Sequence, residues 1–518
     1  MFFLGLLQLG CTPADPVDTS EPVDTQVDSP TDSGEPTPCP ACVPSPASLD
    51  ASLGPAYFST DANRTKNNPL KGFLTSYLWG APVSDFPDQM EFLYLPMKQL
   101  WDANGETLET GLEPYLVAAA EREHHAVLRV YLDYPTKDSG VPDYLQSVVS
   151  CESYTHFGGG CSPDYDNPDL VSAMTGLIEA LGARYDGDNR LGFIQVGLLG
   201  FWGEWHTWPE TDWFPSEETQ RAILDAYHNA FQTTQLQVRR AAVHTTDLRI
   251  GFHDDSFAYS TIGNVDWFFL PGLETAGADS RWEEVAIGGE LRPELQSSVF
   301  SEDYIIDTYS QDVGECIDAT HASYLLNYYA YNGDQQGYIG SARTKAEAAA
   351  LQMGYQFEIL DTSLSLTDMM EGEVEAEITV RITQRGVAPF YYPLYVQLNS
   401  EELGAPVISE KSLHGLLPGK ETAIRFSLGR IPVDAATAPF SLELTSPILQ
   451  DTQQVLLATS TDASAETGPT VVGWDLSCEE NSEVFALGAV VREDADGCAC
   501  RCDVDGTIRT ATGEICDP

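Results

Sequence analysis

The alternation of apolar and polar positions changes character once along this chain, near residue 350. Over residues 57–345, short apolar runs alternate with amphipathic stretches, which indicates strands alternating with helices. About eight such units in roughly 290 residues predict an α/β fold, a (β/α)8 TIM-like barrel, with an open doubly wound sheet as the alternative. Over residues 346–462 the period becomes two, as in Val374–Ile382, and predicts an antiparallel β-sandwich.

The barrel prediction can be stated element by element. Its clearest helices are Glu113–His124, Asp169–Tyr185 and Ser216–Phe231, the last with Ser216 as its N-cap. The eight strands are expected near Phe73, Phe92–Met97, Ala126–Asp133, Leu191–Glu204, Gln237–Ala241, Arg249–His253, Val285–Glu290 and Tyr324–Tyr331.

Both ends of the chain depart from this globular pattern. Residues 1–10 are apolar and lead directly to Cys11, which resembles the end of a bacterial lipoprotein signal with Cys11 as the lipidated residue. Residues 11–56 are rich in Pro, Asp, Ser and Thr, so a disordered acidic tether is predicted. Residues 463–518 are expected to form a linker and a Cys-rich tail, tied by disulfides or, alternatively, binding calcium or zinc.

The formal net charge of −53 at pH 7 narrows the choice of partners. Such a chain is repelled by nucleic acid and by anionic lipid surfaces. We therefore expect an extracytoplasmic monomer that meets the membrane only through a lipid anchor, on the bacterial outer membrane or cell surface. The sequence shows no phosphate-binding glycine loop, and no cofactor is expected.

The segment Gly197–Trp208 carries the strongest signal for chemistry. It reads Gly-Leu-Leu-Gly-Phe-Trp-Gly-Glu-Trp-His-Thr-Trp and directly follows an apolar strand. Glu204 and His206 stand among Trp202, Trp205 and Trp208, whose flat faces are of the kind that stack on sugar rings. An apolar environment raises the pKa of a carboxyl group, which suits a general acid. A tryptophan-rich structural turn is the alternative.

In a (β/α)8 barrel, chemistry is located at the C-terminal ends of the strands. Two carboxyl groups across that mouth, Glu204 and Glu290, would suffice to cleave a glycosidic bond. The alternative for Glu290 is an N-terminal cap of the next helix, and the alternatives for the other polar residues there are a turn, a core histidine or a solvated helix–strand junction. No metal site is predicted. The candidate substrate-binding residues at the strand ends are Arg129, Asp133, His206, His253, Asp254, Asp255 and Arg292, with Arg239 and Arg240 beside the fifth strand.

An insertion after the third strand, Cys151–Cys161, contains three glycines and two terminal cysteines. In an exported protein these two cysteines are expected to form a disulfide. The bond would hold the loop over the barrel mouth.

Four motifs occur in order: Asn68-Pro-Leu-Lys-Gly-Phe, Gly-Phe-Trp-Gly-Glu-Trp-His, Gly251-Phe-His-Asp-Asp-Ser-Phe and Ile287-Gly-Gly-Glu. They resemble an uncharacterised bacterial family that joins a barrel domain to a β-sandwich. That family is in turn similar to the retaining glycoside hydrolase clan with one Glu at the end of strand four and one at the end of strand seven. The resemblance implies that Glu204 is the acid/base and Glu290 the nucleophile. Gly203 stands where that clan usually has Asn, which leaves the sugar open.

Two functions therefore follow from the sequence. The first is a glycoside hydrolase that acts on an extracellular polysaccharide or oligosaccharide by a two-carboxylate retaining mechanism. Its carboxyl groups should lie about 5–5.5 Å apart. The second is a non-catalytic carbohydrate-binding or adhesion lipoprotein on a degenerate barrel.

Overall fold

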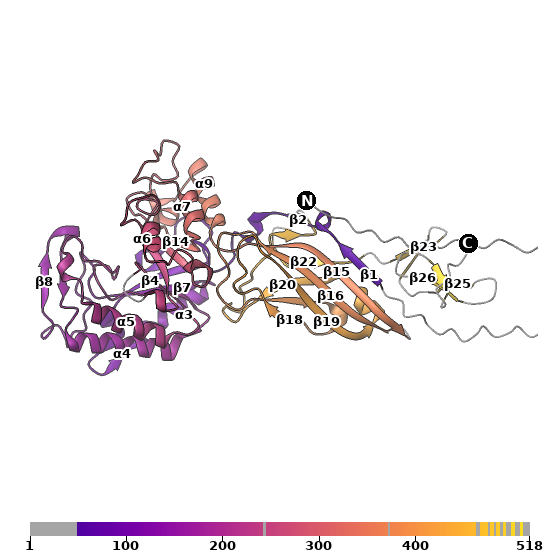
Figure 1. Cartoon of the computed structure of the whole chain (residues 1–518), viewed down its shortest axis with the longest axis horizontal. Coiled ribbons are helices and arrows are strands. Elements are labelled where there is room, and N and C mark those ends of the chain that lie inside the picture. Colours follow the sequence, from indigo (N-terminus) through magenta and orange to yellow (C-terminus); the bar gives the residue numbers. More distant parts are fainter. Residues whose placement is uncertain are drawn as a thin grey trace, which may run out of the picture.

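The computed structural model describes residues 49–241, 245–370, 373–462 and 467–474. After these it describes only the strands β23 (Ser477–Glu480), β24 (Glu483–Ala486), β25 (Val490–Glu493), β26 (Ala499–Cys502) and β27 (Ile508–Thr510). The described part is elongated, with the helix-covered sheet at one end and the antiparallel sheets beside it (Figure 1).

Eight parallel strands form the sheet of the first part, which is consistent with a TIM barrel. Their order in the sheet is β3-β14-β13-β12-β11-β10-β7-β4. A parallel bridge between Thr75 and Glu91 joins the ends of β3 and β4, so the sheet is nearly closed. The strands are β3 (Gly72–Leu74), β4 (Met90–Pro96), β7 (His125–Tyr131), β10 (Leu191–Gln195), β11 (Gln235–Val238), β12 (Gly251–Phe257), β13 (Ile287–Leu291) and β14 (Tyr324–Leu326).

Helices cover the outside of this sheet. The helix α5 (Glu217–Ala230) begins after Ser216, whose side chain accepts a hydrogen bond from the Thr219 amide, as an N-cap does. Its buried face, with Ile223 and Leu224, packs on the barrel wall. The other helices here are α1 (Met97–Leu100), α2 (Leu108–Gly111), α3 (Glu113–Glu121), α4 (Pro168–Tyr185), α6 (Phe269–Thr275), α7 (Val313–Thr320), α8 (Tyr328–Asn332) and α9 (Gly340–Gln352).

The second part contains two four-stranded antiparallel sheets, in the orders β1-β15-β16-β19 and β18-β17-β20-β22. Alternate residues of the strands, such as Ile378 and Val396, are buried and belong to one shared apolar cluster. The strands are β1 (Leu49–Leu53), β15 (Phe357–Met370), β16 (Glu373–Gln384), β17 (Tyr395–Asn399), β18 (Val407–Ser412), β19 (Glu421–Pro432), β20 (Phe440–Thr445) and β22 (Thr470–Val472), with the short helix α10 (Val433–Thr437).

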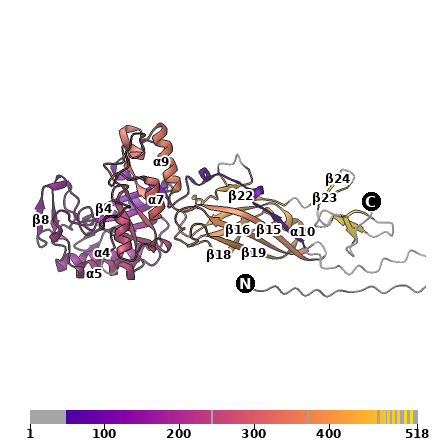
Figure 2. The ribbon, with the colours of Figure 1, turned by 45° about the horizontal axis from the view of Figure 1, so that its top comes forward.

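The antiparallel sheets pack against the N-terminal ends of the barrel strands. His125, at the start of β7, lies 2.9 Å from the Ile448 carbonyl oxygen, and the Gln235 amide at the start of β11 donates to Tyr392 at 3.1 Å. The Tyr392 hydroxyl also donates to the carbonyl of Gly192, at the start of β10. The opposite face of the barrel, at the C-terminal strand ends, therefore points away from the sheets, as both views show (Figures 1 and 2).

Three predicted boundaries need correction. Strand β1 lies within the predicted tether, 11–56, yet it pairs with β15, because its sequence alternates as an edge strand does. Helix α9 runs to Gln352, past the predicted start of the sandwich at 346. Strand β22 completes a sheet from within the predicted linker, because Val472 packs in the apolar cluster. The predictions for Cys11 and the signal lie outside the described residues, as do the side chains of the tail cysteines.

Among the described residues, no helix has the length and apolar character that crossing a membrane requires.

Candidate active site at the C-terminal strand ends

The backbone that carries Glu204 is strained on both sides. After β10 the chain turns back, and Leu198, Trp202 and Trp205 have positive φ angles of 69°, 54° and 55°. Residues other than glycine rarely adopt this left-handed backbone conformation, and those that do are concentrated where function requires a fixed geometry. The amide of Trp202 donates to the backbone carbonyl of Asp133 at 2.8 Å, which ties the turn to the end of β7. The turn therefore presents Glu204 at the barrel mouth in one defined position.

Glu204 is held by two arginines from neighbouring strands. Arg129 Nη1 on β7 lies 3.3 Å from Glu204 Oε1, and Arg239 Nη1, just after β11, lies 2.5 Å from Oε2. The Glu204 side chain is 13% exposed. Both guanidinium groups also contact Asp255 on β12, at 2.7 and 3.0 Å. Two carboxylates and two guanidinium groups thus form one buried ion-pair network beneath the mouth.

Asp255 neutralises the centre of this network. Its side chain is 1% exposed, and burial alone would raise its pKa. The charges of Arg129, His253 and Arg239 outweigh burial and hold the pKa of Asp255 well below its ordinary value. His253 Nδ1 lies 3.1 Å from Asp255 Oδ1, although burial lowers the pKa of His253. Asp255 is therefore the fixed counter-charge that keeps both arginines in place.

Glu290 has the opposite surroundings. It lies on β13 two residues after Gly288, whose missing side chain leaves room for the Tyr324 ring inside the barrel, so Glu290 shares that inward face. Within the described residues its carboxyl group has no hydrogen bond or ion pair to another side chain. Burial raises the pKa of Glu290 well above its ordinary value, and the negative charges of Asp255 and Glu204 raise it further.

A polar layer below the network fixes Arg129. Arg129 Nε donates to Gln195 at 2.8 Å, and Gln195 donates to the Tyr324 hydroxyl at 3.2 Å. The Tyr324 hydroxyl donates in turn to Gln237. These residues come from β7, β10, β11 and β14, so the layer connects four of the eight strands and holds the arginine in place.

The other predicted polar residues fall in different places. His206 Nε2 lies 3.5 Å from Glu204 Oε2, beside the network. Asp254 points out of the barrel, where it accepts hydrogen bonds from Thr261 and the Ser256 amide and fixes the loop after β12. Arg292 pairs with Glu294 at 3.0 Å and lies over the Tyr259 ring, so it does not contact Glu290.

The three tryptophans differ in exposure and in what they contact. Trp205 is 4% exposed and donates its indole N–H to the Val196 carbonyl at 2.7 Å, so it belongs to the barrel core and not to the mouth. Trp202 is half-buried and its ring centroid lies 6.1 Å from that of His206. Trp208 is 62% exposed. The expectation that all three could face a sugar is thus corrected for Trp205.

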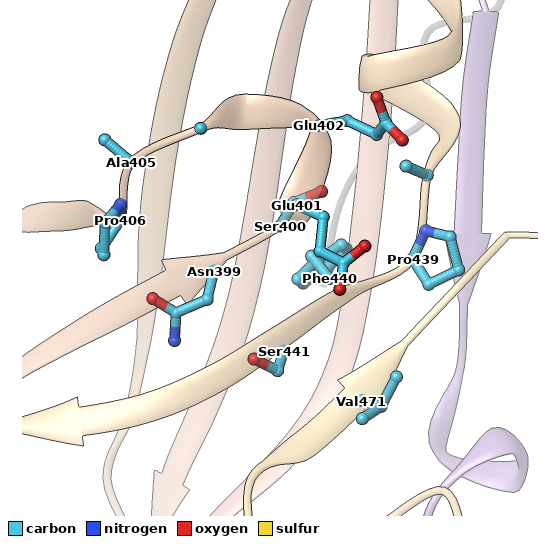
Figure 3. A pocket seen from close by; sticks show the side chains of 12 residues that line it. Asn399, Ser400, Glu401, Glu402, Ala405, Pro406, Pro439, Phe440, Ser441 and Val471 are labelled. Carbon is cyan, nitrogen blue, oxygen red and sulfur yellow. The ribbon is translucent and has the colours of Figure 1, made fainter.

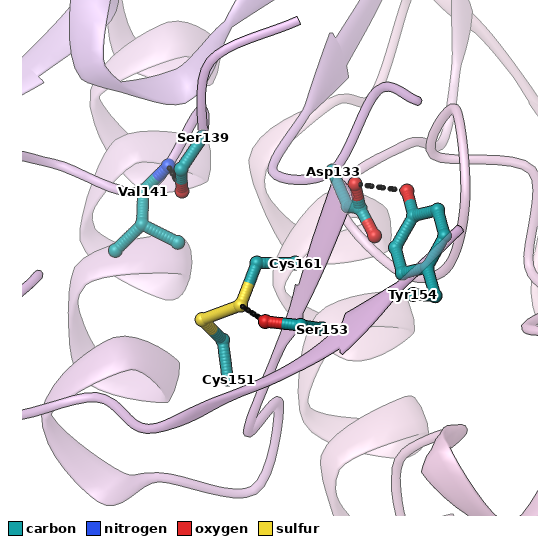
Figure 4. The surroundings of a disulfide bond; sticks show 7 residues. All are labelled: Asp133, Ser139, Val141, Cys151, Ser153, Tyr154 and Cys161. Carbon is teal, nitrogen blue, oxygen red and sulfur yellow. Dashed lines mark hydrogen bonds between the residues drawn. A yellow bond between two sulfur atoms is a disulfide. The ribbon is translucent and has the colours of Figure 1, made fainter. Parts of the chain in front are cut away.

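Asp133 forms a hydrogen bond with the insertion after the third strand. Its Oδ1 accepts a 2.7 Å hydrogen bond from Tyr154 on β8 (Cys151–Tyr154), which pairs with β9 (Gly160–Pro163) as a hairpin (Figure 4). A disulfide joins Cys151 to Cys161, with Cα atoms 5.5 Å apart. Burial raises the pKa of Asp133 to about 6. Asp133 therefore anchors this hairpin to the barrel.

Two residues of the site were missed or undervalued in the sequence. The sequence places Arg239 only beside the fifth strand, yet its guanidinium group contacts both Glu204 and Asp255. Tyr94 on β4 donates to the Trp202 carbonyl, and its ring lies beside the Arg129 guanidinium. The alternation of Phe92 and Tyr94 on one face of a strand next to Arg129 is the signal that would have found it.

Other features of the described residues do not compete with this site. Among them, no group of three or more His, Cys, Asp or Glu side chains is arranged to hold a metal ion. A hollow of about 580 Å³ lies on the antiparallel sheets, between the segment 399–406 and the ends of β20 and β22 (Figure 3). Glu401 and Glu402 are its only charged lining residues. This hollow therefore lies apart from the ion-pair network, and the network identifies the candidate site.

No protein-family model matches the chain. No curated protein matches its sequence. Among solved structures, endo-glycoceramidase II from Rhodococcus sp. aligns with a TM-score of 0.34 and 12% identity, over 70% of this chain and 97% of the other. The xylanase XynB from Paenibacillus barcinonensis aligns with 0.26 and 13%, over 52% and 86%, and a trimodular GH5_4 subfamily endoglucanase with 0.31 and 11%, over 75% and 78%. Because these values are low, function is inferred from the chain's own residues.

Proposed function

We propose that this protein is a glycoside hydrolase that cleaves a neutral extracellular glycan with Glu204 and Glu290 as its two carboxyl groups. One observation carries the proposal: the two groups lie at the same face of the barrel in opposite electrostatic surroundings. Glu204 contacts two guanidinium groups, whereas the pKa of Glu290 is raised by burial and by neighbouring carboxylates. A charged and a protonated carboxyl group side by side are what glycosidic bond cleavage uses.

The contacts favour a division of roles opposite to that implied by the resemblance. The protonated Glu290 gives its proton to the glycosidic oxygen while the bond from that oxygen to the anomeric carbon breaks. A Glu204 oxygen forms a new bond to that carbon, giving a glycosyl ester. Glu290, now a carboxylate, takes a proton from water, whose oxygen attacks the anomeric carbon and releases Glu204. The separation of about 5–5.5 Å between the carboxyl groups, which this retaining route requires, stays a prediction.

The neighbouring residues have supporting roles in this scheme. Arg129 and Arg239 pair with Glu204 and hold it in one orientation, and Asp255 balances their charge. His206, whose pKa is lowered by burial, can donate or accept a hydrogen bond to a sugar hydroxyl in its neutral form. Trp202 and Trp208 offer apolar ring faces to the sugar.

The cellular setting is part of the proposal. A disulfide at Cys151–Cys161 suits an oxidising compartment. We infer a lipid anchor at Cys11, a location outside the cytoplasm and a monomeric state on the sequence features alone. Acylation of Cys11, detected by mass spectrometry of the membrane fraction, would test the anchor.

A non-catalytic carbohydrate-binding protein is the second candidate. The observation in its favour is that both Glu204 oxygens already have arginine contacts, as in a purely structural ion pair. A binder would retain glycan on its surface and release no reducing ends.

The test is hydrolysis of a panel of neutral polysaccharides and 2,4-dinitrophenyl glycosides. Glu204→Gln and Glu290→Gln should each abolish hydrolysis, since each removes one of the two reacting groups. Glu204→Gly and Glu290→Gly are then assayed with azide. With our division of roles, azide replaces the nucleophile in Glu204→Gly and gives a glycosyl azide of inverted configuration, whereas Glu290→Gly gives the retained one. The reverse pair of products would restore the roles implied by the resemblance, and wild-type hydrolysis by both Gln variants would refute the proposal.

A further inference from the structure

Three aromatic rings form a continuous wall beside the candidate site. Phe157 in the β8–β9 hairpin contacts Trp202 with ring centroids 5.0 Å apart and Trp208 with centroids 6.3 Å apart. Phe157 is 41% exposed and Trp208 is 62% exposed. Large exposed aromatic side chains that cluster on a surface mark binding sites more often than isolated ones do. We call Phe157, Trp202 and Trp208 the aromatic wall.

The hairpin holds Phe157 in this place by several independent contacts. The disulfide Cys151–Cys161 joins its two strands, and Tyr154 donates to Asp133 at the end of β7 (Figure 4). The amide of Thr136 donates to the Gly159 carbonyl at 2.7 Å, so the tip is also attached. Phe157 itself has a φ of 54°, which a residue at a freely moving loop tip would relax. The ring is therefore fixed before any ligand arrives.

The aromatic wall is continuous with the carboxyl groups. Trp202 is two residues before Glu204, and its ring lies 6.1 Å from His206, which in turn lies 3.5 Å from Glu204. The wall and the network thus share one face of the barrel, the face turned away from the antiparallel sheets. A ligand bound at Glu204 and Glu290 that extends toward the hairpin would meet these rings.

We propose that the aromatic wall is a sugar-binding subsite in which Phe157, delivered by the disulfide-locked hairpin, contacts a pyranose ring beyond the one at the carboxyl groups. This inference rests on the proposed function. The wall offers apolar ring faces, and the chain carries a formal net charge of −53, which repels anionic ligands. The matching ligand is therefore the apolar face of an uncharged sugar and not a sulfated or uronic acid unit. The substrate class is then a neutral oligosaccharide or polysaccharide and not a single glycoside.

The test is binding in the Glu290→Gln background, which leaves the wall intact. Cellopentaose, xylopentaose, mannopentaose and laminaripentaose are titrated by calorimetry and by tryptophan fluorescence. Phe157→Ala should weaken binding of the recognised pentasaccharide by about 5- to 20-fold, which corresponds to the loss of one stacked ring. Phe157→Tyr keeps the ring and should restore most of the affinity. Val148→Ala, an exposed apolar residue of the same connection, is the matched control and should change nothing.

Removal of the disulfide provides the second arm. The double variant Cys151→Ser, Cys161→Ser should lose part of the affinity that Phe157→Ala loses, because the hydrogen bonds of Tyr154 and Thr136 remain. The two losses should be less than additive when the changes are combined, because both act on the same contact. Equal affinity of Phe157→Ala and its parent, or no binding of any pentasaccharide, would overturn the proposal. Phe157-dependent binding by a wild-type protein that hydrolyses nothing would uphold the subsite and refute the hydrolase function.

Discussion

At the scale of single residues, Glu204 and Glu290 differ in what their charge does to the folded state. Glu204 is paired with Arg129 and Arg239, so its charge stabilises the network. The pKa of Glu290 is raised in the folded state by burial and by the charges of Asp255 and Glu204. A carboxyl group with a raised folded-state pKa binds its proton more tightly when folded, so it reduces stability as pH rises above the ordinary value of about 4.3.

Replacement of the two carboxyl groups by amides should therefore have opposite effects on stability. At pH 7.5, Glu290→Gln should raise the melting temperature by about 1 °C, as a gain of about 1 kcal/mol does in a cooperative body of about 400 residues. Glu204→Gln removes the partner of two arginines and should cost about 2–3 kcal/mol. Calorimetric melting of both variants between pH 4 and pH 8 checks this.

The dependence on pH is the internal control. The advantage of Glu290→Gln should shrink toward zero as the pH falls to 4, where the wild-type carboxyl is mostly protonated both folded and unfolded. A stabilising effect of Glu204→Gln, or an advantage of Glu290→Gln that does not change with pH, would contradict the assigned surroundings.

At the scale of elements, the hydrogen bond from Tyr154 to Asp133 is the side-chain contact that anchors the β8–β9 hairpin to the end of β7, beside the backbone contact of Thr136 with Gly159. Tyr154→Phe removes the donor to Asp133 and leaves a buried carboxyl without it. We expect a loss of about 1–2 kcal/mol, because the acceptor is a charged group above its pKa of about 6. Hydrogen exchange of the amides in 151–163 should become faster while that of α4 and α5 stays unchanged. Tyr144→Phe, an exposed tyrosine of the same connection, is the control; equal protection in Tyr154→Phe would show that the disulfide alone holds the hairpin.

The sequence predicts the positions of the strands but not which side chains at their ends contact one another. The spacing of apolar residues predicts the strand positions. Glu204, Asp255 and Arg129 could be placed at one face because the C-terminal ends of parallel strands meet at one face of a barrel. Which of these side chains form ion pairs with one another could not be predicted. Whether Asp254 or Asp255 points inward depends on strand register, and Arg239 reaches Glu204 only because β11 lies between β10 and β12. Phe157 meets Trp202 through a hairpin whose tilt no local pattern encodes.

At the scale of the whole molecule, the antiparallel sheets close the N-terminal face of the barrel and leave the mouth free. The two parts are joined by hydrogen bonds between residues far apart in the sequence. The Asn68 side chain exchanges two hydrogen bonds with the Leu456 backbone, and Gln453 lies 3.2 Å from His125. Barrel and sheets also share one buried apolar cluster. We therefore regard the two parts as one cooperative body in which the state of the junction affects the stability of both.

Lys71 makes this junction sensitive to pH. Its buried ammonium group donates to the carbonyls of Leu351 in α9 and of Tyr355 before β15, at 2.9 and 3.0 Å, and it has no carboxylate partner among the described residues. Burial lowers the pKa of Lys71 to about 7. A base with a lowered folded-state pKa makes the unfolded chain bind more protons between that value and the ordinary value of about 10.4. Stability from this group therefore rises with pH across that window and is level below it.

Lys71→Met should remove this dependence, since it keeps the length of the side chain and lacks the proton. The difference in unfolding free energy between wild type and Lys71→Met should move in favour of wild type by about 1.4 kcal/mol per pH unit between about pH 7.5 and pH 9.5. Urea unfolding at fixed ionic strength measures it, and Lys66→Met, at an exposed position, should run parallel to wild type. Because the high negative charge of the chain is common to all three proteins, its own pH dependence cancels in the differences. Parallel curves for wild type and Lys71→Met would mean that Lys71 stays charged when folded, with the two carbonyls compensating its burial in full.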